Sequence, residues 1–167
     1  MRKIIIIGAG GHAKSLIDLI LSTGKWQIEG LVGNYDELGK RILGFEVKWN
    51  DKELTKIVHD YKYAVLGFAS LGMQKKRILF IENLKKIGFI LPSIISPNAY
   101  ISKHSEIGEG TTIGHFSLVN ANSTIGKFCI INSQSLIEHD VRIEDFCHIS
   151  TSVTVNGGVT LGQETFI

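Results

Sequence analysis

The residues best suited to catalysis are His139 and Asp140, which follow one another directly. A carboxylate beside an imidazole raises its basicity and fixes its tautomer. Such a pair suits a general base that removes a proton near neutral pH. Cys129 and Cys147 offer a second kind of chemistry, as reactive thiols or as a disulfide. The choice between the two depends on the elements that hold these side chains.

The second half of the chain carries a six-residue repeat. Every sixth position is Ile, Val or Leu, and a small side chain follows four residues later. A period of six fits neither a 3.6-residue helix nor a two-residue strand alternation, but it is typical of a parallel β-helix of stacked coils. The repeated positions are Ile101, Ile107, Ile113, Val119, Ile125, Ile131, Ile137, Ile143, Ile149, Val155, Leu161 and Ile167.

If three hexapeptides complete one coil, residues 18 apart in the sequence lie one above the other. Eighteen residues after His139 comes Gly157, followed by Gly158, so the corner above the imidazole carries no side chain. That corner leaves a slot for a substrate and makes the Gly157 amide a candidate oxyanion donor. The same spacing stacks Cys129 and Cys147 on the small inward register, which favours two buried fillers over a disulfide.

The other histidines of the repeat lie elsewhere on the coil. His148 comes nine residues after His139, half a coil away, and is therefore expected on a different edge. The two could share one site only across the interface of a three-fold oligomer. Zinc bound between such edges is the competing possibility, but it needs more nitrogens than these two histidines supply, and we expect no metal. His104 and His115 fall off the inward register and are expected to be exposed.

The first part of the chain alternates predicted strands and helices. The strands are expected at residues 3–7, 26–32 and 63–66, and the helices at residues 13–21, 53–60 and 71–87. This alternation predicts a small parallel α/β sheet. Pro92 and Pro97 bracket residues 93–96, which we expect to form the hinge between two domains, 1–95 and 96–167.

A glycine turn joins the first predicted strand and helix. Gly8 and Gly10 let the backbone turn tightly, so that amides at the helix start can meet a phosphate. A dinucleotide-binding fold has an acid at the end of its second strand, where this chain has Gly33 and Asn34. A nicotinamide cofactor is therefore not expected. Two alternatives stay open: a nucleotide in another form, or glycines that serve only the turn.

Charge and hydropathy exclude two classes of partner. A net charge of +2 with 20% charged residues gives no basic stripe of the kind that nucleic acid requires. The Ile-rich start is interrupted by glycines, His12 and Lys14, and no apolar stretch of membrane-spanning length follows. We therefore expect a cytoplasmic protein with neither a nucleic acid nor a membrane as its partner.

Taken together, these features resemble the bacterial hexapeptide-repeat sugar acetyltransferases. That family includes nucleotide-aminosugar N-acetyltransferases and sialic acid O-acetyltransferase-like proteins. The resemblance implies a Rossmann-like sugar-nucleotide-binding domain followed by a left-handed β-helix, in a homotrimer that binds acetyl-CoA between adjacent subunits. The matching residues are the opening Gly8-x-Gly10-Gly11-His12, and then Asn132, Glu138-His139-Asp140 and His148 in the repeat.

The resemblance also implies roles for individual residues of the repeat. His139 would be the general base, and Asp140 the carboxylate that strengthens it. His148 and the Gly157 amide would contact the acetyl thioester, with Gly158 beside them in the coenzyme site.

Further residues are implied to bind the substrate. Asn132 would line the acceptor site, and the sugar nucleotide would be held in the first domain by Gly11, His12, Ala13 and Gly67. The reaction implied is direct transfer of acetyl from acetyl-CoA to the amino group of a nucleotide-linked 4-amino deoxysugar. The alternatives are an O-acetyltransferase acting on sialic acid-like sugars, and a non-catalytic sugar-nucleotide-binding or scaffold protein.

The chain departs from this family in two places. Relatives often have an Asp-Asp pair where Gly33 and Asn34 stand. Relatives also usually continue for further coils beyond the position of Ile167. We therefore expect a truncated β-helix, which lacks residues that would finish the coenzyme pocket.

Overall fold

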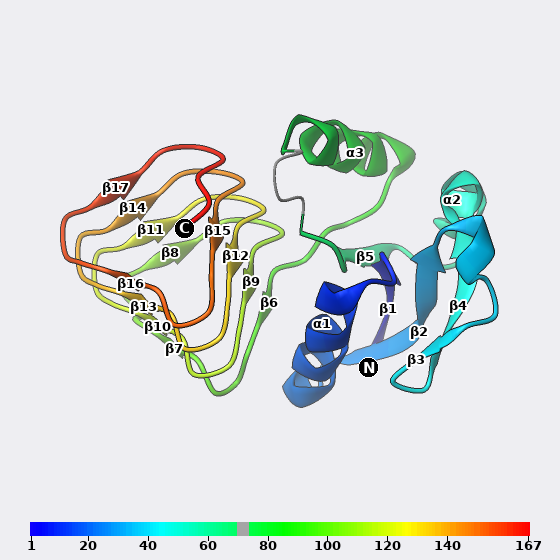
Figure 1. Ribbon diagram of the computed structural model, residues 1–167, viewed down its shortest axis with the longest axis horizontal. Helices are drawn as coiled ribbons and strands as arrows, with labels where there is room; N and C mark the ends of the chain where they lie inside the picture. The colour runs from blue at the N-terminus through cyan, green and yellow to red at the C-terminus, as the bar shows by residue number, and fades with distance from the viewer. Residues whose placement is uncertain (70–73) are drawn as a thin grey trace. The chain divides into compact units, whose positions relative to one another are not determined.

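The computed structural model describes residues 1–69 and 74–167, which fold into two units (Figure 1). The first unit is Met1–Pro92 and the second is Ser93–Ile167. Within the described residues, no helix has both the length and the apolar character needed to cross a membrane.

The first unit is built on a five-stranded sheet in the order β3-β4-β2-β1-β5, parallel except for the β3–β4 pair. The strands are β1 (Arg2–Ile7), β2 (Trp26–Gly33), β3 (Arg41–Ile42), β4 (Phe45–Asn50) and β5 (Tyr63–Leu66). The α-helices are α1 (Gly11–Thr23), α2 (Leu54–Ile57) and α3 (Gln74–Ile87). Single 3-10 turns, η1 (Tyr35–Glu37) and η2 (Asp51–Glu53), follow β2 and β4.

The core of this unit explains the central place of β1. The side chains from Ile4 to Ile7 are at most 2% exposed, as expected for a β-branched run in a strand covered on both faces. Helix α1 is followed by Gly24, whose φ of 63° is the left-handed conformation that glycine adopts most readily. The buried residues of α1 follow helical spacing: Ala13, Leu16, Ile17, Leu19 and Ile20.

The predicted elements of this unit are found, with two differences. The helix expected at 53–60 is the turn η2 followed by the single turn α2. Strands β3 and β4 are not predicted from the sequence, and they are joined by Leu43 and Gly44. Both of these residues have positive φ, the conformation of a tight hairpin turn. The helix expected from residue 71 is described from Gln74 onward, and its first three positions lie outside the described residues.

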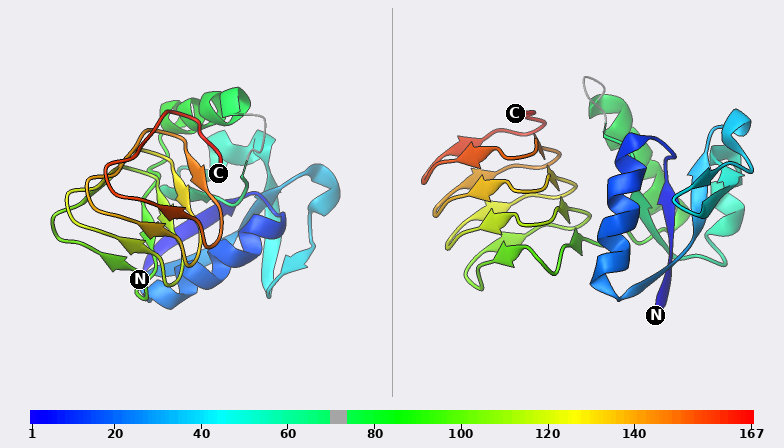
Figure 2. Two further views of the ribbon diagram at one scale, coloured as in Figure 1. Left: turned by 60° about the vertical axis from the view of Figure 1, so that its left-hand side comes forward. Right: turned by 60° about the horizontal axis from the view of Figure 1, so that its bottom comes forward.

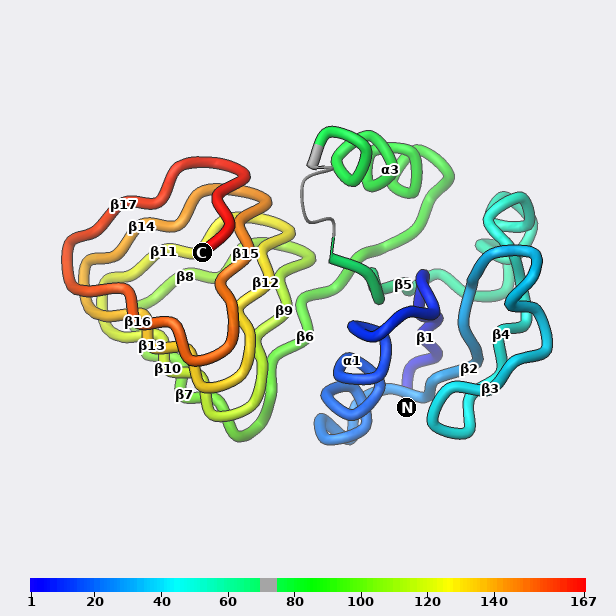
Figure 3. The backbone as a smooth tube through the Cα atoms, viewed as in Figure 1, coloured from blue at the N-terminus to red at the C-terminus, as the bar shows by residue number. Residues whose placement is uncertain are grey.

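The second unit is a left-handed β-helix of two-residue strands (Figures 2 and 3). The strands form three parallel sheets, β7-β10-β13-β16, β8-β11-β14-β17 and β6-β9-β12-β15. Their bounds are β6 (Ile94–Ile95), β7 (Tyr100–Ile101), β8 (Glu106–Ile107), β9 (Thr112–Ile113), β10 (Leu118–Val119), β11 (Thr124–Ile125), β12 (Ile130–Ile131), β13 (Leu136–Ile137), β14 (Arg142–Ile143), β15 (His148–Ile149), β16 (Thr154–Val155) and β17 (Thr160–Leu161).

The pairing of these strands confirms the 18-residue coil. Leu118 lies beside Leu136, and Val119 beside Ile137, and the other pairs repeat this offset. The repeated aliphatic side chains form one core cluster inside the coils. The corners repeat as well, because every sixth residue from Gly110 to Glu164 has a positive φ.

Small inward-pointing side chains hold successive coils together. The Ser117 hydroxyl donates to the carbonyl of Asn132 at 2.8 Å, fifteen residues further along, and the other small polar residues of this register repeat the bond. The Cys147 thiol bonds to the Gly162 carbonyl in the same way, at 3.1 Å. Cys129 and Cys147 are buried free thiols, which confirms their prediction as fillers.

The prediction of a hinge at residues 93–96 is wrong. Ile94 and Ile95 form β6, the first strand of the β-helix, which pairs with β9. The backbone N–H of Ser96 donates to the Ile113 carbonyl at 3.0 Å. The two flanking prolines therefore bracket a strand, and the second unit starts at Ser93.

Candidate active site

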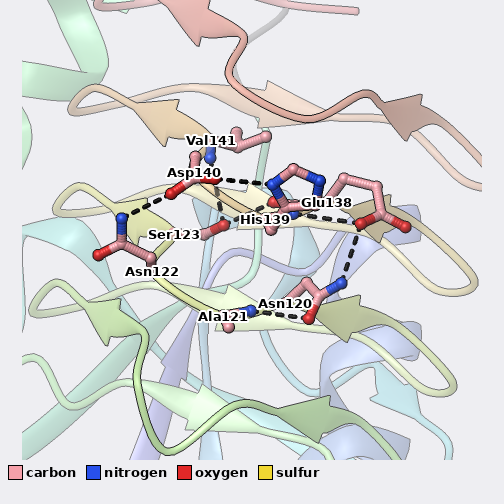
Figure 4. A network of polar contacts seen from close by, with 8 residues as sticks. All are labelled: Asn120, Ala121, Asn122, Ser123, Glu138, His139, Asp140 and Val141. Atoms are coloured by element: carbon pink, nitrogen blue, oxygen red, sulfur yellow. Dashed lines mark hydrogen bonds and ion pairs between the residues drawn. The ribbon is translucent and has the colours of Figure 1, made fainter.

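His139 lies at the corner that follows β13 (Figure 4). Its Nδ1 donates to Asp140 Oδ2 at 2.7 Å, which leaves the lone pair on Nε2. Asp140 has a φ of 60°, a left-handed conformation that Asp tolerates better than most residues. The second carboxylate oxygen, Asp140 Oδ1, accepts from the Asn122 amide at 2.6 Å.

A second pair of side chains supports the same corner from the coil below. The Asn120 amide donates to Glu138 Oε2 at 2.9 Å, and the same oxygen accepts from the His139 backbone N–H at 3.2 Å. Neither Asn120 nor Asn122 is predicted from the sequence. Each lies 18 residues before the carboxylate that it binds, so the coil length applied to Glu138 and Asp140 would have found them.

Hydrogen bonds, rather than burial, set the ionisation of this corner. The Asp140 carboxylate raises the pKa of His139, first by accepting its hydrogen bond and then by its charge. The amide of Asn122 and the imidazole together lower the pKa of Asp140. The side chains of His139 and Asp140 are 62% and 52% exposed, so the pair is open to a substrate.

Gly157 lies over the imidazole, as the coil length predicts. A Cβ atom on Gly157 would lie 2.8 Å from His139 Cε1 and 2.9 Å from Nε2, so only glycine leaves this space free. The Gly158 N–H donates to the His139 carbonyl at 3.0 Å. By contrast, the Gly157 N–H has no acceptor among residues 1–69 and 74–167.

His148 and Asn132 form a separate cluster on another sheet. His148 begins β15, and Asn132 follows β12, its neighbour in that sheet. The Asn132 amide donates to His148 Nε2 at 2.8 Å, and the His148 ring contacts Phe166 edge-on. Within one chain the two histidines therefore lie on different sheets, which agrees with the prediction of different edges.

The two remaining histidines of the β-helix differ from one another. His104 is exposed, as predicted. The prediction is wrong for His115, which is half-buried and lies with Nδ1 2.7 Å from the Ser96 hydroxyl. The β-helix begins at β6, before the repeat that the sequence shows from Ile101 onward. The sequence therefore does not predict that Ser96 lies in the coil next to His115. Among the described residues, no three His, Cys, Asp or Glu side chains are grouped to hold a metal ion.

The first unit contains a cavity of about 450 Å³ at the carboxyl ends of its parallel strands. This is where ligands bind in open α/β sheets, next to the strand from which the chain order reverses. Here that strand is β1, which has β2 on one side and β5 on the other. The cavity is lined by Ile7, Gly8, Ala9, Gly10, Val32, Gly33, Asn34, Glu37, Asp51, Phe68, Lys76, Arg77 and Phe80.

The predicted sugar-nucleotide residues lie around the start of α1. Gly11 begins the helix, which has neither a capping side chain nor an acid in its first turn. His12 Nε2 is buried without a partner in the described part of the chain, and burial, followed by the charge of Arg77, lowers the pKa of this imidazole. Ala13 is buried in the core. Gly67 packs so tightly that a Cβ atom there would lie 2.7 Å from Ile6 Cγ2.

Comparison with known proteins matches both units. Residues 3–84 match the family model of the PglD N-terminal domain. Across 99% of the chain, the fold matches a histidine-to-asparagine variant of perosamine N-acetyltransferase from Caulobacter crescentus, solved with CoA and GDP-perosamine. The identity is 28%, the TM-score is 0.89, and 77% of that protein is covered. Residues 3–84 therefore match the PglD N-terminal domain family, and the whole chain resembles hexapeptide-repeat sugar acetyltransferases.

Two further relatives support and limit this assignment. The acetyltransferase domain of PglB from Neisseria gonorrhoeae FA1090, in complex with acetyl coenzyme A, is 26% identical with a TM-score of 0.78. The match covers 99% of this chain and 84% of that domain. An uncharacterised protein, L142, of Acanthamoeba polyphaga mimivirus is 31% identical over 121 residues, 70% of this chain. The match spans only 24% of that viral protein's length.

Proposed function

We propose that this protein transfers acetyl from acetyl-CoA to the amino group of a nucleotide-linked 4-amino deoxysugar. The observation that carries the proposal is the corner at His139, where an exposed imidazole bonded to Asp140 faces a glycine. The likeness to proteins solved with CoA, acetyl coenzyme A or GDP-perosamine supports the choice of co-substrate and acceptor. A role in glycan biosynthesis and a cytoplasmic location, where acetyl-CoA is available, belong to the same proposal.

The proposed reaction is a direct attack of the amine on the thioester. The neutral sugar nitrogen forms a bond to the carbonyl carbon while His139 Nε2 removes its proton. The carbonyl oxygen becomes an oxyanion, which the Gly157 N–H stabilises. The C–S bond then breaks, and coenzyme A leaves as a thiol after taking a proton. No cysteine is needed as a nucleophile, and both cysteines are buried inside the coils.

The proposed assembly is a homotrimer with each active site between two subunits. One subunit supplies His139, Asp140 and Gly157, and its neighbour supplies Asn132 and His148. The separation of these two clusters on different sheets of one chain supports this division. Gly158 lies next to Gly157 and completes the coenzyme side of the corner. In the first unit, Gly11, His12, Ala13 and Gly67 form the sugar-nucleotide side.

His139→Ala tests the proposed base. We expect the variant to lose on the order of 10²- to 10⁴-fold in kcat, because proton transfer in the transition state contributes about that much. The assay measures thiol release from acetyl-CoA with nucleotide 4-amino sugars as acceptors, and with sialic acids as the competing acceptors. Turnover close to that of the wild type would exclude His139 as the base. Faster release with sialic acids would favour the O-acetyltransferase instead.

A further inference from the structure

Glu37 places a carboxylate at the end of β2, where the sequence itself has Gly33 and Asn34. This residue lies in η1, and its Oε2 accepts the backbone N–H of Asn34 at 2.8 Å. A Cβ atom on Gly33 would lie only 2.9 Å from the same Oε2. The glycine therefore leaves room for the Glu37 carboxylate to fold back over the end of β2 and reach the cavity.

A second carboxylate, Asp51, lies at the end of the adjoining strand. Asp51 follows β4 directly, and the β2–β4 pairing places Asn50 beside Gly33. Among the described residues, none donates a hydrogen bond to its carboxylate, which lines the same cavity. Partial burial raises the pKa of the Asp51 carboxyl, because it disfavours the charged form. A ligand that donates hydrogen bonds to the carboxylate would stabilise this charged form. The residue remains accessible at the surface.

The order of the strands arranges these groups along one line. The glycine turn follows β1, Glu37 covers the end of β2, and Asp51 follows β4. Neighbouring strands are about 4.8 Å apart, so successive strand ends match the spacing of phosphate, ribose and base in a nucleotide. A nucleotide bound along this line would place its phosphates at the turn and the start of α1, and its ribose hydroxyls at Glu37.

We propose that Asp51 selects a guanine base in the nucleotide of the acceptor sugar. Guanine presents two adjacent donors, N1–H and the N2 amino group, which one carboxylate can accept together. Uracil and thymine present one N–H between two carbonyl oxygens. A carboxylate that accepts this N–H would be repelled by the carbonyl oxygens on either side. The Phe68 and Phe80 rings, 5.8 Å apart, form an apolar wall of the cavity beside the glycine turn, at the opposite end from Asp51.

The test is nucleotide binding measured by calorimetry without acetyl-CoA. The inference rests on the proposed sugar-nucleotide acceptor, but binding can be measured apart from acetyl transfer. We expect the wild type to bind GDP about tenfold or more tightly than IDP, which lacks the N2 amino group, or UDP. Asp51→Asn should reduce the preference for GDP over UDP to about twofold or less, with little change in UDP affinity. Asp60→Asn, an exposed Asp outside the cavity, is the matched control and should keep the preference.

The outcomes separate the two proposals. A wild type that prefers UDP, binds no diphosphate, or keeps its GDP preference after Asp51→Asn overturns the guanine assignment, whatever the thiol-release assay shows. A preference for GDP that depends on Asp51, without thiol release from any amino sugar, supports the guanine site and overturns the acetyl transfer.

Discussion

The His139 imidazole owes its basicity to one neighbour. Its side chain is 62% exposed, so burial does little to penalise the protonated form. Asp140 raises the pKa of the imidazole, and Asn122 occupies the other carboxylate oxygen. The amide therefore orients Asp140 so that one oxygen always faces Nδ1. Asn122 touches no reacting atom in the proposed mechanism and acts as a positioning residue.

The pH dependence of the reaction follows from this arrangement. The proposed general base must be neutral to accept a proton, so kcat/KM should rise with pH through the pKa of His139, which lies above the ordinary histidine value. Asp140→Asn removes the cause of the raised pKa, so the midpoint should move to lower pH and the plateau rate should fall, though less than in His139→Ala. Asn122→Ala should shift the midpoint in the same direction by a smaller amount, as measured in pH–rate profiles.

Asn120→Ala is the matched control for Asn122→Ala. It removes the same kind of side chain two positions away, but the partner lost is Glu138 rather than Asp140. The midpoint should stay close to that of the wild type. Equal shifts from the two asparagine variants would contradict a specific role for Asn122.

The sequence predicts part of this corner and omits the rest for a clear reason. His139 and Asp140 are adjacent in the chain, and Gly157 follows from the coil length. The bonds from Asn122 to Asp140 and from Asn120 to Glu138 depend on which way side chains point at two stacked corners. Spacing places these residues together, but it does not show which of them are bonded.

At the scale of elements, the coil gives each position a fixed neighbour above and below. A regular six-residue period specifies strands, corners and interior together, so the β-helix is predicted almost completely. The exception is β6, whose residues precede the recognised repeat. In the first unit, the short β3 and β4 carry too few residues for a clear alternation. Asp51 follows one of these unpredicted strands, so no pattern in the sequence places it in the cavity.

Gly157→Ala tests the stacking of coils at the active site. The new methyl group would lie under 3 Å from the imidazole, so the His139 ring must move away from its position. We expect a loss of kcat of at least tenfold, because a base must lie within hydrogen-bonding reach of its proton. Thermal unfolding should change little, since the displaced group is the end of an exposed side chain. Steady-state kinetics and thermal melts provide the two measurements.

Gly162→Ala is the control for this substitution. A Cβ atom at Gly162 meets no atom within 4 Å, so the variant should keep its activity. A fully active Gly157→Ala enzyme would show that the space above His139 is not needed.

At the scale of the whole molecule, the two polar clusters on different sheets can be tested as halves of one site shared by two subunits. His139→Ala and His148→Ala each disable one cluster of the proposed shared site. In trimers formed at random from an equimolar mixture, about a quarter of the sites would combine intact residues from two subunits. We therefore expect the mixture, unfolded and refolded together, to regain about a quarter of wild-type thiol release. Subunits with self-contained sites would regain none.

The two periods of the β-helix also constrain how such a chain can change length in evolution. Six residues restore the aliphatic interior, but only eighteen return a side chain to the same face. Loss of one hexapeptide between His139 and Gly157 would leave a well-packed protein, with the glycine carried round to another corner. Insertions and deletions that preserve folding would therefore take the proposed active site apart unless they came as whole coils.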